Sequence, residues 1–380
     1  MKTKRRKNRG QPGQDGHVHP RVMISGYYGF DNLGDELILR VLVDELKAHQ
    51  VQITVLSQNP EKTAQQYGVQ AIKRTNVLAI IDALAQTNLF ISGGGGLFQD
   101  ATGPMSAIYY GGLIRLAHFF DVPVCFWAQG VGPLRRLMSR RMTASALKRC
   151  EVVTVRDEGS AALIQKLTGS RPEITADPVW LLNTGKKHPE SPRNLNDKHK
   201  RHEPWRVGIS LRPWHELTEA RQQALADSLK TLAQSVDCPV EFWLLPFQKE
   251  EDTHLLKHFG ERFGPSEKFK LVFIPPDQVM EKLGQCHAII GMRFHSLILG
   301  LLHHIPVYGL VYDPKVASLL EMFQLQGTRI DALETIQAKN IKHYFEHYTP
   351  VDLQPLKQQS KRNFQILNRL LDIPEGELVI

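Results

Sequence analysis

Residues 286–313 read CHAIIGMRFHSLILGLLHHIPVYGLVYD and combine three segments of different pattern. The run from Cys286 to Ile290 is short and apolar, as in a buried strand. The following apolar stretch predicts a helix over residues 297–304, with Ser296 as its N-cap. A second strand, PVYGLVYD, closes the stretch. A strand, a helix and a strand in this order are typical of a parallel sheet with a crossover helix.

The same alternation extends outward over most of the 380 residues. It stops only at a polar, proline-containing segment, NTGKKHPESPRNLNDKHKRHEP, which has no apolar periodicity and reads as a linker. The fold class we predict is therefore α/β, with two doubly wound, Rossmann-like domains facing each other across a cleft. The predicted parts are a basic disordered tail (1–20), an N-terminal domain (21–183), the linker (184–204), a C-terminal domain (205–345) and a C-terminal helical segment (346–380) that could pack back on the N-terminal domain.

The net charge of +8 at pH 7 is concentrated at the start of the chain. Residues 1–20 hold six basic side chains and one acidic side chain, so the tail supplies five of the eight positive charges. The tail has no apolar central region and does not read as a secretory signal. We expect a solvated arm that could contact anionic lipid. No stretch of the sequence has the length and apolar character of a membrane span.

The four cysteines are far apart and match no metal-ligand spacing, so we predict no metal site. Three of them lie in apolar surroundings and read as buried thiols, which favours a reducing, cytoplasmic compartment.

Three glycine-containing loops follow predicted strands in the first half: GYYGFDNLGDE, ISGGGGLFQD and AQGVGP. Their spacing fits neither the dinucleotide fingerprint nor a P-loop. Four consecutive glycines carry a large entropic cost, which implies a positive φ or a backbone that something approaches closely. We expect these loops to contact a polar ligand, and the candidate residues are Gly29, Asn32, Gly34, Asp35, Gly93, Gly94, Gly95, Gln129 and Gly130.

Arginines end two further strands. Arg156 is followed directly by Asp157 and Glu158, which cannot face it because adjacent residues on a helix point in different directions. We therefore expect its guanidinium to be available for a ligand. Arg212 ends the strand RVGISL in the second half. Asp177 also ends a strand, and as a residue before proline it needs only a turn role.

Arg293 and His295 lie between the strand and the helix of the opening stretch. The positive end of a helix dipole at a strand terminus suits an anion. An arginine and a histidine two residues apart at such a position favour a functional role over a structural one. His303 and His304, at the far end of that helix, read as surface or packing residues.

With these residues in view, the sequence resembles the polysaccharide pyruvyl transferase family, in its bacterial cell-wall or exopolysaccharide branch. The resemblance runs from about Val22 to Asp313, and no single motif decides it. The ordered set that carries it is GYYGFDNLGDE, ISGGGGLFQD, AQGVGP, VRDEGS, ADP, GISLRP and GMRFHSL. The chain departs from the family pattern at Phe294, where the family usually has leucine, and at Ala128, where it usually has glycine.

The resemblance implies a fold of the GT-B type and a reaction in which phosphoenolpyruvate, the donor, gives its pyruvyl group to two hydroxyls of a sugar. A cyclic ketal forms and phosphate leaves, without a metal or redox cofactor. Guanidinium forks match the donor's phosphate and carboxylate. The donor-binding residues implied are Arg156, Arg293, Ser296 and Lys315. His295 would serve as acid or base, and Asp31 would bind or activate the sugar hydroxyl.

The residues alone leave two other classes open. A GT-B glycosyltransferase that uses a nucleotide sugar would share the fold, but retaining members generally carry acids near the donor in the second domain. Here Asp313 is the only acid between Glu281 and Glu321. A nucleic-acid-binding protein that uses the tail would not need the glycine loops, so we do not expect nucleic acid as a partner. The expected partners are phosphoenolpyruvate and a sugar or lipid-linked oligosaccharide, at a cytoplasmic location or at the inner face of the membrane.

Overall fold

The computed structural model describes residues 19–100, 103–185 and 202–374. The chain divides into two compact units: the first comprises residues 1–183 and 354–380, and the second comprises residues 184–353. The basic tail lies almost entirely outside the described residues, and so does most of the predicted linker. Residues 346–353, which were predicted to begin the C-terminal segment, belong to the second unit.

The first unit is built on a parallel sheet in the order β3-β2-β1-β4-β6-β7-β8, with β5 paired to β6. Its central strands β1, β4 and β6 are buried along nearly their whole length because helices cover both faces. The strands are β1 (Arg21–Ser25), β2 (Gln52–Ser57), β3 (Gln70–Lys73), β4 (Leu89–Ser92), β5 (Gly95–Phe98), β6 (Val124–Val131), β7 (Val152–Val155) and β8 (Glu173–Ile174).

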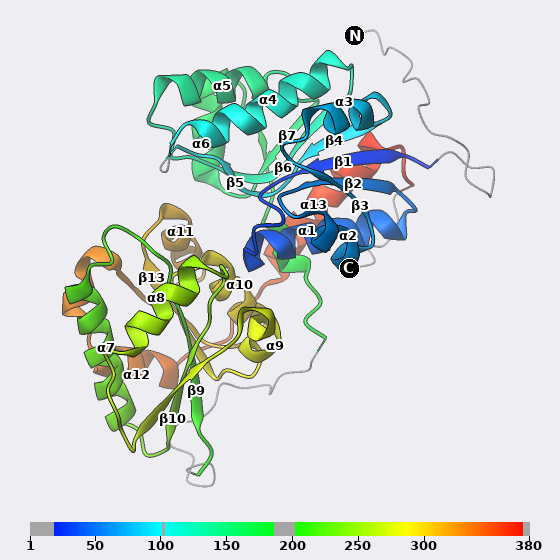
Figure 1. Ribbon diagram of the computed structural model, residues 1–380. Coiled ribbons are helices and arrows are strands. Elements are labelled where there is room, and N and C mark those ends of the chain that lie inside the picture. The colour runs from blue at the N-terminus through cyan, green and yellow to red at the C-terminus, as the bar shows by residue number, and fades with distance from the viewer. Residues whose placement is uncertain (1–18, 101–102, 186–201, 375–380) are drawn as a thin grey trace. The chain divides into compact units, whose positions relative to one another are not determined.

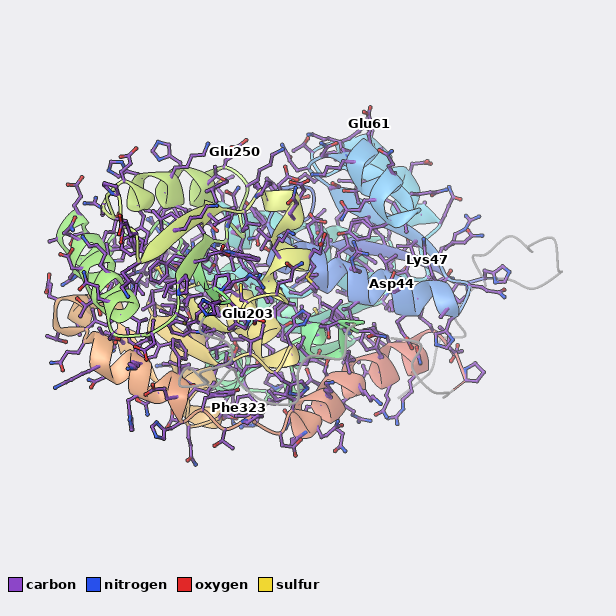
Figure 2. The ribbon with its side chains drawn as sticks, turned by 90° about the horizontal axis from the view of Figure 1, so that it is seen from below. Asp44, Lys47, Glu61, Glu203, Glu250 and Phe323 are labelled. Carbon is purple, nitrogen blue, oxygen red and sulfur yellow. The ribbon has the colours of Figure 1, made fainter. Side chains whose placement is uncertain are left out.

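Two groups of helices cover the two faces of this sheet (Figure 1). One face carries α3 (Val77–Ala85), α4 (Met105–Phe119), α5 (Leu137–Leu147) and α6 (Glu158–Thr168). The other face carries α1 (Leu33–Ala48), α2 (Pro60–Tyr67) and α13 (Gln354–Leu370). A short 3-10 helix, η1 (Pro178–Leu181), follows β8. Figure 2 shows Asp44 and Lys47 on the solvent side of α1, whereas Ile38 and Leu42 are buried, as expected of an amphipathic helix.

The last helix, α13, is fastened to the first unit by a buried polar network. The amide of Asn363 donates to the carbonyl of Ala176 at 2.9 Å, and its oxygen accepts from Thr175 at 2.8 Å. Trp127 donates its indole N–H to the carbonyl of Asn363 and packs edge-on against Phe364. The residues of this network lie in β6, in the segment that follows β8, and in α13. Helix α13 therefore completes the core of the first unit, although it is far along the chain from the strands that it covers.

The second unit repeats the plan with a parallel sheet in the order β11-β10-β9-β12-β13-β14. The strands are β9 (Trp205–Ser210), β10 (Val240–Leu244), β11 (Phe269–Phe273), β12 (Ala288–Gly291), β13 (Val307–Val311) and β14 (Gly327–Arg329). The helical segments are α7 (Glu219–Gln234), α8 (Glu251–Gly260), η3 (Pro276–Gln278), α9 (Val279–Leu283), α10 (Phe294–Leu302), α11 (Pro314–Met322), η4 (Ile330–Thr335) and α12 (Ala338–Glu346). Two doubly wound parallel sheets confirm the predicted α/β class.

The opening stretch differs from its predicted form at the helix start. The helix α10 begins at Phe294, three residues earlier than predicted, because Arg293 is the last residue with extended dihedrals, at φ −67° and ψ 124°. Ser296 is therefore not the N-cap. Its hydroxyl lies inside the first turn and donates to the carbonyl of Arg293 at 2.6 Å. His295 consequently belongs to the helix itself rather than to the residues ahead of it.

Candidate functional site

In both units the strand order reverses beside the first strand. β2 and β3 lie on one side of β1 and β4 lies on the other; in the second unit β10 and β11 lie on one side of β9 and β12 lies on the other. In open α/β sheets, ligands bind at the carboxyl ends of the two strands that flank such a reversal. The loops that follow β1, β4, β9 and β12 are therefore the candidate binding loops, and most of the predicted site residues lie in them or at the start of the element that comes next.

The loop after β1 is held by its own polar groups. The amide of Gly29 donates to Glu36 at 2.8 Å, and the side chain of Asn32 caps α1 by accepting from the amide of Gly34 at 3.2 Å. Gly29 has a φ of 76°, and a Cβ there would lie 2.2 Å from the hydroxyl of Ser57. Three of the predicted ligand-contacting residues thus have a structural role in closing the turn.

Asp31 projects from the same loop in a less common conformation. Its φ of 57° is left-handed, which a residue other than glycine rarely adopts and which recurs at functional sites. The carboxylate pairs with Lys62 of α2, and its side chain is 34% exposed. The loop therefore presents a solvent-accessible carboxylate with a cation beside it.

The run of four glycines is explained largely by the protein's own side chains. A Cβ on Gly93 would lie 2.4 Å from the hydroxyl of Tyr28, and one on Gly94 would lie 2.8 Å from Ile38. Gly95 alone of the four has a positive φ, 100°, and a Cβ there would meet Asp35 at 2.5 Å. Gly96 is exposed, with nothing within 4 Å of such a Cβ. The close approach predicted from these glycines is real, but it is made by residues of the first unit.

Tyr28 is the residue that the sequence did not single out here. It is fully buried, and a Cβ on Gly26 would also collide with its ring, so two loops are shaped around it. Its burial, followed by the charges of Asp35 and Glu36, raises the pKa of its phenol well above the ordinary value. The phenol of Tyr28 is therefore neutral, and it lies in the loop after β1, beside the strand reversal of the first unit. Its only sequence signal is its place between two glycines.

Farther along the sheet, Gln129 and Gly130 fix the strand ends. The amide of Gln129 donates to the carbonyl and to the hydroxyl of Ser92, both at 2.8 Å, and so ties β6 to β4. A Cβ on Gly130 would lie 3.0 Å from the guanidinium of Arg156. Gly130 thus provides the space in which that arginine lies.

Arg156, whose guanidinium was expected to be available for a ligand, has a buried carboxylate partner that lies elsewhere in the sequence. Its Nη1 lies 2.5 Å from Oδ2 of Asp177, and the two side chains are 6% and 0% exposed. Burial acts to lower the pKa of Arg156, but Asp177 and Asp157 outweigh it and raise the pKa. Asp157 and Glu158 are engaged elsewhere, with the amide of Ser160 and with Arg171. Asp177, predicted only as a turn residue, is the buried counter-ion.

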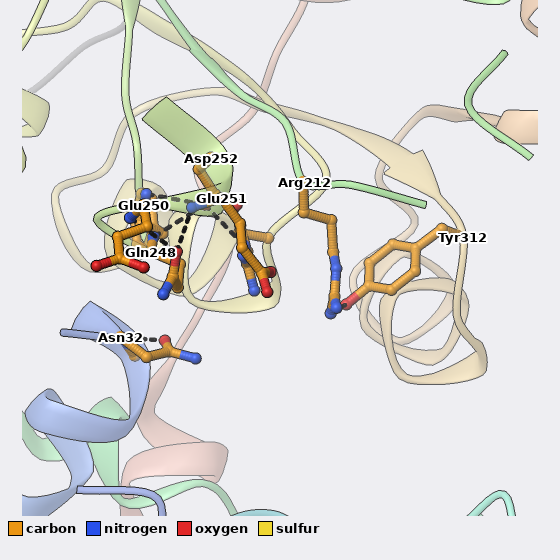
Figure 3. A network of polar contacts seen from close by, with 10 residues as sticks. Asn32, Arg212, Gln248, Glu250, Glu251, Asp252 and Tyr312 are labelled. Atoms are coloured by element: carbon orange, nitrogen blue, oxygen red, sulfur yellow. Dashed lines mark hydrogen bonds and ion pairs between the residues drawn. The ribbon is translucent and has the colours of Figure 1, made fainter. Parts of the chain in front are cut away.

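The second unit holds Arg293 in the same way. Its Nε donates to Asp252 at 2.9 Å and its Nη2 donates to the other carboxylate oxygen, a two-pronged pair. Asp252 also accepts from the amides of Phe247 and Gln248 ahead of α8. Figure 3 shows Gln248, Glu250, Glu251 and Asp252 gathered at the start of this helix. Asp252 carries no signal in the sequence, because it follows directly after two acidic residues, Glu250 and Glu251, that are exposed.

Arg212, which follows β9, has different surroundings. Its Nη1 donates to the hydroxyl of Tyr312 at 3.2 Å, and Figure 3 shows the two side chains pointing toward each other. Lys315, after β13, lies with its Nζ 5.7 Å from the centre of the same ring. Among the described residues no carboxylate pairs with Arg212, and its Nε is buried without a hydrogen-bond partner. We call Arg212, Tyr312 and Lys315 the cationic cluster.

The cationic cluster changes the ionisation of its tyrosine. Burial acts to raise the pKa of Tyr312, but Lys315 and Arg212 outweigh it and lower the pKa below the ordinary phenol value. A phenol whose pKa is lowered by cations reports a locally positive potential. Such a potential, at the carboxyl edge and beside a strand reversal, is suited to an anionic ligand. Tyr312 carried no signal in the sequence beyond its position at a strand end.

The predicted residues divide between the two units. Arg212, Arg293, His295 and Ser296 follow the neighbouring strands β9 and β12, and Lys315 follows the adjacent β13. The remaining predicted residues follow the strands β1, β4 and β7 of the first unit, except that Gln129 and Gly130, which were predicted in a loop, lie within β6. In the described ranges no group of three or more histidine, cysteine, aspartate or glutamate side chains is arranged to hold a metal ion. None of the described helices is long and apolar enough to cross a membrane.

Solved structures with the same overall architecture confirm a GT-B-like fold. The chain aligns with a candidate UDP-N-acetylglucosamine 2-epimerase from Listeria monocytogenes at a TM-score of 0.63 and 12% identity, covering 96% of this chain and 100% of that one. The UDP-N-acetylglucosamine 2-epimerase from Neisseria meningitidis, bound to UDP-GlcNAc, gives 0.59 and 13%, covering 93% and 100%. Anabaena Alr3699/HepE, in complex with UDP and glucose, gives 0.56 and 12%, covering 93% and 96%. At such identities the likeness establishes the fold alone.

The sequence comparisons are more specific. No curated protein matches the chain significantly. The family described as polysaccharide pyruvyl transferase matches residues 32–314, a span that begins in the loop after β1 and ends just after β13. The match includes the first glycine loop from Asn32 onward, the other two glycine loops, both buried arginine–aspartate pairs and two of the three members of the cationic cluster. Because it spans well over half of the sequence, the chain belongs to the polysaccharide pyruvyl transferase family.

Proposed function

We propose that this protein transfers the pyruvyl group of phosphoenolpyruvate to two hydroxyls of a cell-wall or exopolysaccharide sugar, forming a cyclic ketal and releasing phosphate. The family match supports a pyruvyl transferase that acts on a polysaccharide. The observation that carries the choice of donor is the cationic cluster: a guanidinium with no carboxylate partner in the described residues, a lysine, and a tyrosine whose pKa they lower.

The reaction needs a proton at the methylene carbon of phosphoenolpyruvate and an attack on the neighbouring carbon. One sugar hydroxyl adds across the double bond and loses its proton, while the methylene becomes a methyl group. The second hydroxyl then attacks the same carbon, the bond from that carbon to the phosphate oxygen breaks, and the hydroxyl's proton leaves with the inorganic phosphate. His295 is suited to deliver or accept a proton, because an imidazole ring offers one nitrogen that donates and one that accepts. It lies in the first turn of α10, two residues after Arg293.

The arginines have unequal roles in this proposal. Arg156 and Arg293 are each paired with a buried aspartate, so each pair is close to neutral overall and contributes N–H donors in fixed positions. Arg212 supplies the net positive charge toward the donor's phosphate and carboxylate, and Lys315, which lies 3.9 Å from Asp313, adds N–H donors beside it. Ser296 and the loops of the first unit would complete the binding of donor and acceptor, and Asp31 would orient the attacking hydroxyl.

Phosphoenolpyruvate is already an activated donor, so we expect turnover without a metal or redox cofactor. The acceptor is a sugar, free or carried on a lipid-linked oligosaccharide, and the proposed location is the cytoplasm or the inner face of the membrane. The decisive experiment is incubation with phosphoenolpyruvate labelled in its pyruvyl carbons and a panel of such acceptors. The proposal predicts labelled ketal and free phosphate in equal amounts, and phosphate release without labelled sugar would refute it.

A nucleotide-sugar glycosyltransferase is the second candidate, because solved structures of similar fold carry UDP or UDP-sugars. Between Glu281 and Glu321 of the second unit, where an acid near a nucleotide-sugar donor is expected, the only one is Asp313, which caps α11 and lies 3.9 Å from Lys315. Incubation with UDP-sugars separates the two functions. Release of a nucleoside diphosphate, with no label taken from phosphoenolpyruvate, would favour the glycosyltransferase.

A further inference from the structure

Large apolar side chains are exposed in one part of the first unit. Seven are strongly exposed in the described part of the chain, and five of them lie in the first turns of α3, α4 and α5. Their exposed fractions range from 59% to 81%. They are Val77, Leu78, Met105, Leu137 and Met138, and we call them the helix-start row.

The helix-start row lies along a single edge of the unit. In a parallel sheet each helix begins where the preceding strand ends, so these first turns stand at the carboxyl edge, the edge of the candidate loops. Tyr109 of α4 donates to the carbonyl of Arg74, just ahead of α3, at 2.8 Å. Gly111 of α4 packs against Met142 and Ala146 of α5. The three helices are therefore neighbours on the same face, as Figure 1 also shows.

Positive charge surrounds the α5 end of the row. Residues 122–150 contain six basic side chains and no acidic one. Arg135 and Arg136 directly precede Leu137 and Met138, and Arg141 lies within one turn after them; these three arginines are exposed. A density of charge this high would repel a second copy of the same surface.

This segment is also held in place. The carboxylate of Asp100 accepts from the amides of Arg135 and Arg136, at 2.9 and 2.7 Å. Burial acts to raise the pKa of Asp100, but these amide bonds outweigh it and lower the pKa. Because Asp100 binds the backbone amides, it leaves both arginine side chains exposed to solvent. Leu137 and Met138, which follow them, are exposed as well.

We propose that the helix-start row and its arginines form a docking surface for an anionic lipid bilayer. The leucine and methionine side chains would enter the headgroup boundary while the arginines bind lipid phosphates, the combination that interfacial anchors use. Nucleic acid fits less well, because the row offers no aromatic side chain for base stacking. The contact itself does not depend on the reaction. Its use, which is to bring the carboxyl edge of the first unit to a lipid-linked acceptor, rests on the proposed function.

The test measures sedimentation of the full chain with vesicles of phosphatidylcholine, with and without phosphatidylglycerol, in the absence of phosphoenolpyruvate. We expect binding only to the anionic vesicles. The double variant Leu137→Glu/Met138→Glu should lower the partition coefficient at least about tenfold. Arg135→Glu/Arg136→Glu should lower it by more than about 25-fold, since loss of each arginine is worth near fivefold and each glutamate adds repulsion. Met322→Glu is the matched control, since this methionine is 59% exposed on α11 of the second unit, and it should bind as the wild type does.

Leu78→Glu, on a separate helix, provides an independent variant if the double variant does not fold. If the wild type, Leu137→Glu/Met138→Glu and Leu78→Glu bound the anionic vesicles equally well, the proposal would be overturned. Any membrane contact would then be assigned to the basic tail. Equal binding to neutral vesicles, or loss of binding in Met322→Glu, would also overturn it. Turnover on a soluble acceptor should be the same in all variants. A failure of membrane binding therefore leaves the proposed reaction intact, and a failure of the reaction leaves the docking surface intact.

Discussion

The strand reversals of the two units differ in how their charged side chains are paired. In the first unit the glycine loops enclose Tyr28, Asp35 and Arg156, and the main charged groups are matched within the unit. In the second unit Arg293 is matched by Asp252, but Arg212 and Lys315 converge on Tyr312. The same topology therefore supports a tightly fitted framework in one unit and a positive potential in the other. The position of a motif at a sheet edge predicts where a ligand can bind, and the pairing of its charges predicts which ligand.

Among substitutions in the second unit, loss of His295 should lower turnover the most. If His295 transfers the proton, His295→Gln should lower kcat by roughly 10²–10⁴ while the Kd for phosphoenolpyruvate changes far less. Steady-state kinetics and calorimetry measure the two quantities separately. His304→Asn is the control, since His304 is exposed at the far end of the same helix and asparagine tolerates its φ of 54°. Near-normal kcat in His295→Gln would reduce this histidine to a packing residue.

The arginine–aspartate pairs are common to both units, and we expect them to matter first for stability. Asp252→Ala leaves the charge of Arg293 buried and unmatched, so the free energy of unfolding should fall by about 3–5 kcal/mol. Asp177→Ala should cost a similar amount in the first unit for the same reason. Asp227→Ala, which removes an exposed pair with Lys230, should cost less than about 1 kcal/mol. A loss of that small size in Asp252→Ala, by urea unfolding, would show that Arg293 finds another partner.

The framework role of the first unit can be tested within its glycine run. Gly93→Ala places a methyl group against the hydroxyl of Tyr28 and should cost about 1–3 kcal/mol of unfolding free energy. Gly96→Ala, three residues away in open space, should stay within about 0.5 kcal/mol of the wild type.

Adding Tyr28→Phe removes the clashing oxygen and should recover part of the loss in Gly93→Ala. Equal stability of Gly93→Ala and Gly96→Ala would show that Gly93 is not needed to make room for Tyr28. The run of glycines would then be explained by close approach of a ligand, as the sequence suggested.

Much of the fold could be predicted from the alternation of patterns, because apolar strands and amphipathic helices have different periods. The start of α10 could not, because Ser296 has the chemistry of an N-cap while the backbone turns at Arg293. The candidate positions Arg212, Arg293 and His295 could be predicted as strand-end residues. Their counter-ions could not: Asp252 is 41 residues from Arg293 and Asp177 is 21 residues from Arg156, and only the folded chain brings them together.

A smaller effect should appear in the pH dependence of donor binding. Because the pKa of Tyr312 is lowered, its phenol ionises before the pH reaches the ordinary value of 10.0 and adds a negative charge beside Arg212 and Lys315. Donor affinity should therefore fall as the pH rises toward that value, by about fivefold, which corresponds to ~1 kcal/mol. Tyr312→Phe cannot ionise and should lose this fall. An identical alkaline profile in Tyr312→Phe would mean that another group titrates there.

The most direct test of the difference between the two units is calorimetric binding of phosphoenolpyruvate to Arg212→Ala. A charge-assisted hydrogen bond is worth roughly 1.5–3 kcal/mol, so the Kd should rise by about tenfold or more, with only partial recovery in Arg212→Lys. Arg206→Ala is the matched control, because Arg206 lies at the opposite end of the same strand, where it pairs with Glu241; its Kd should match that of the wild type. An unchanged Kd in Arg212→Ala would contradict the account and remove the cationic cluster from the donor site.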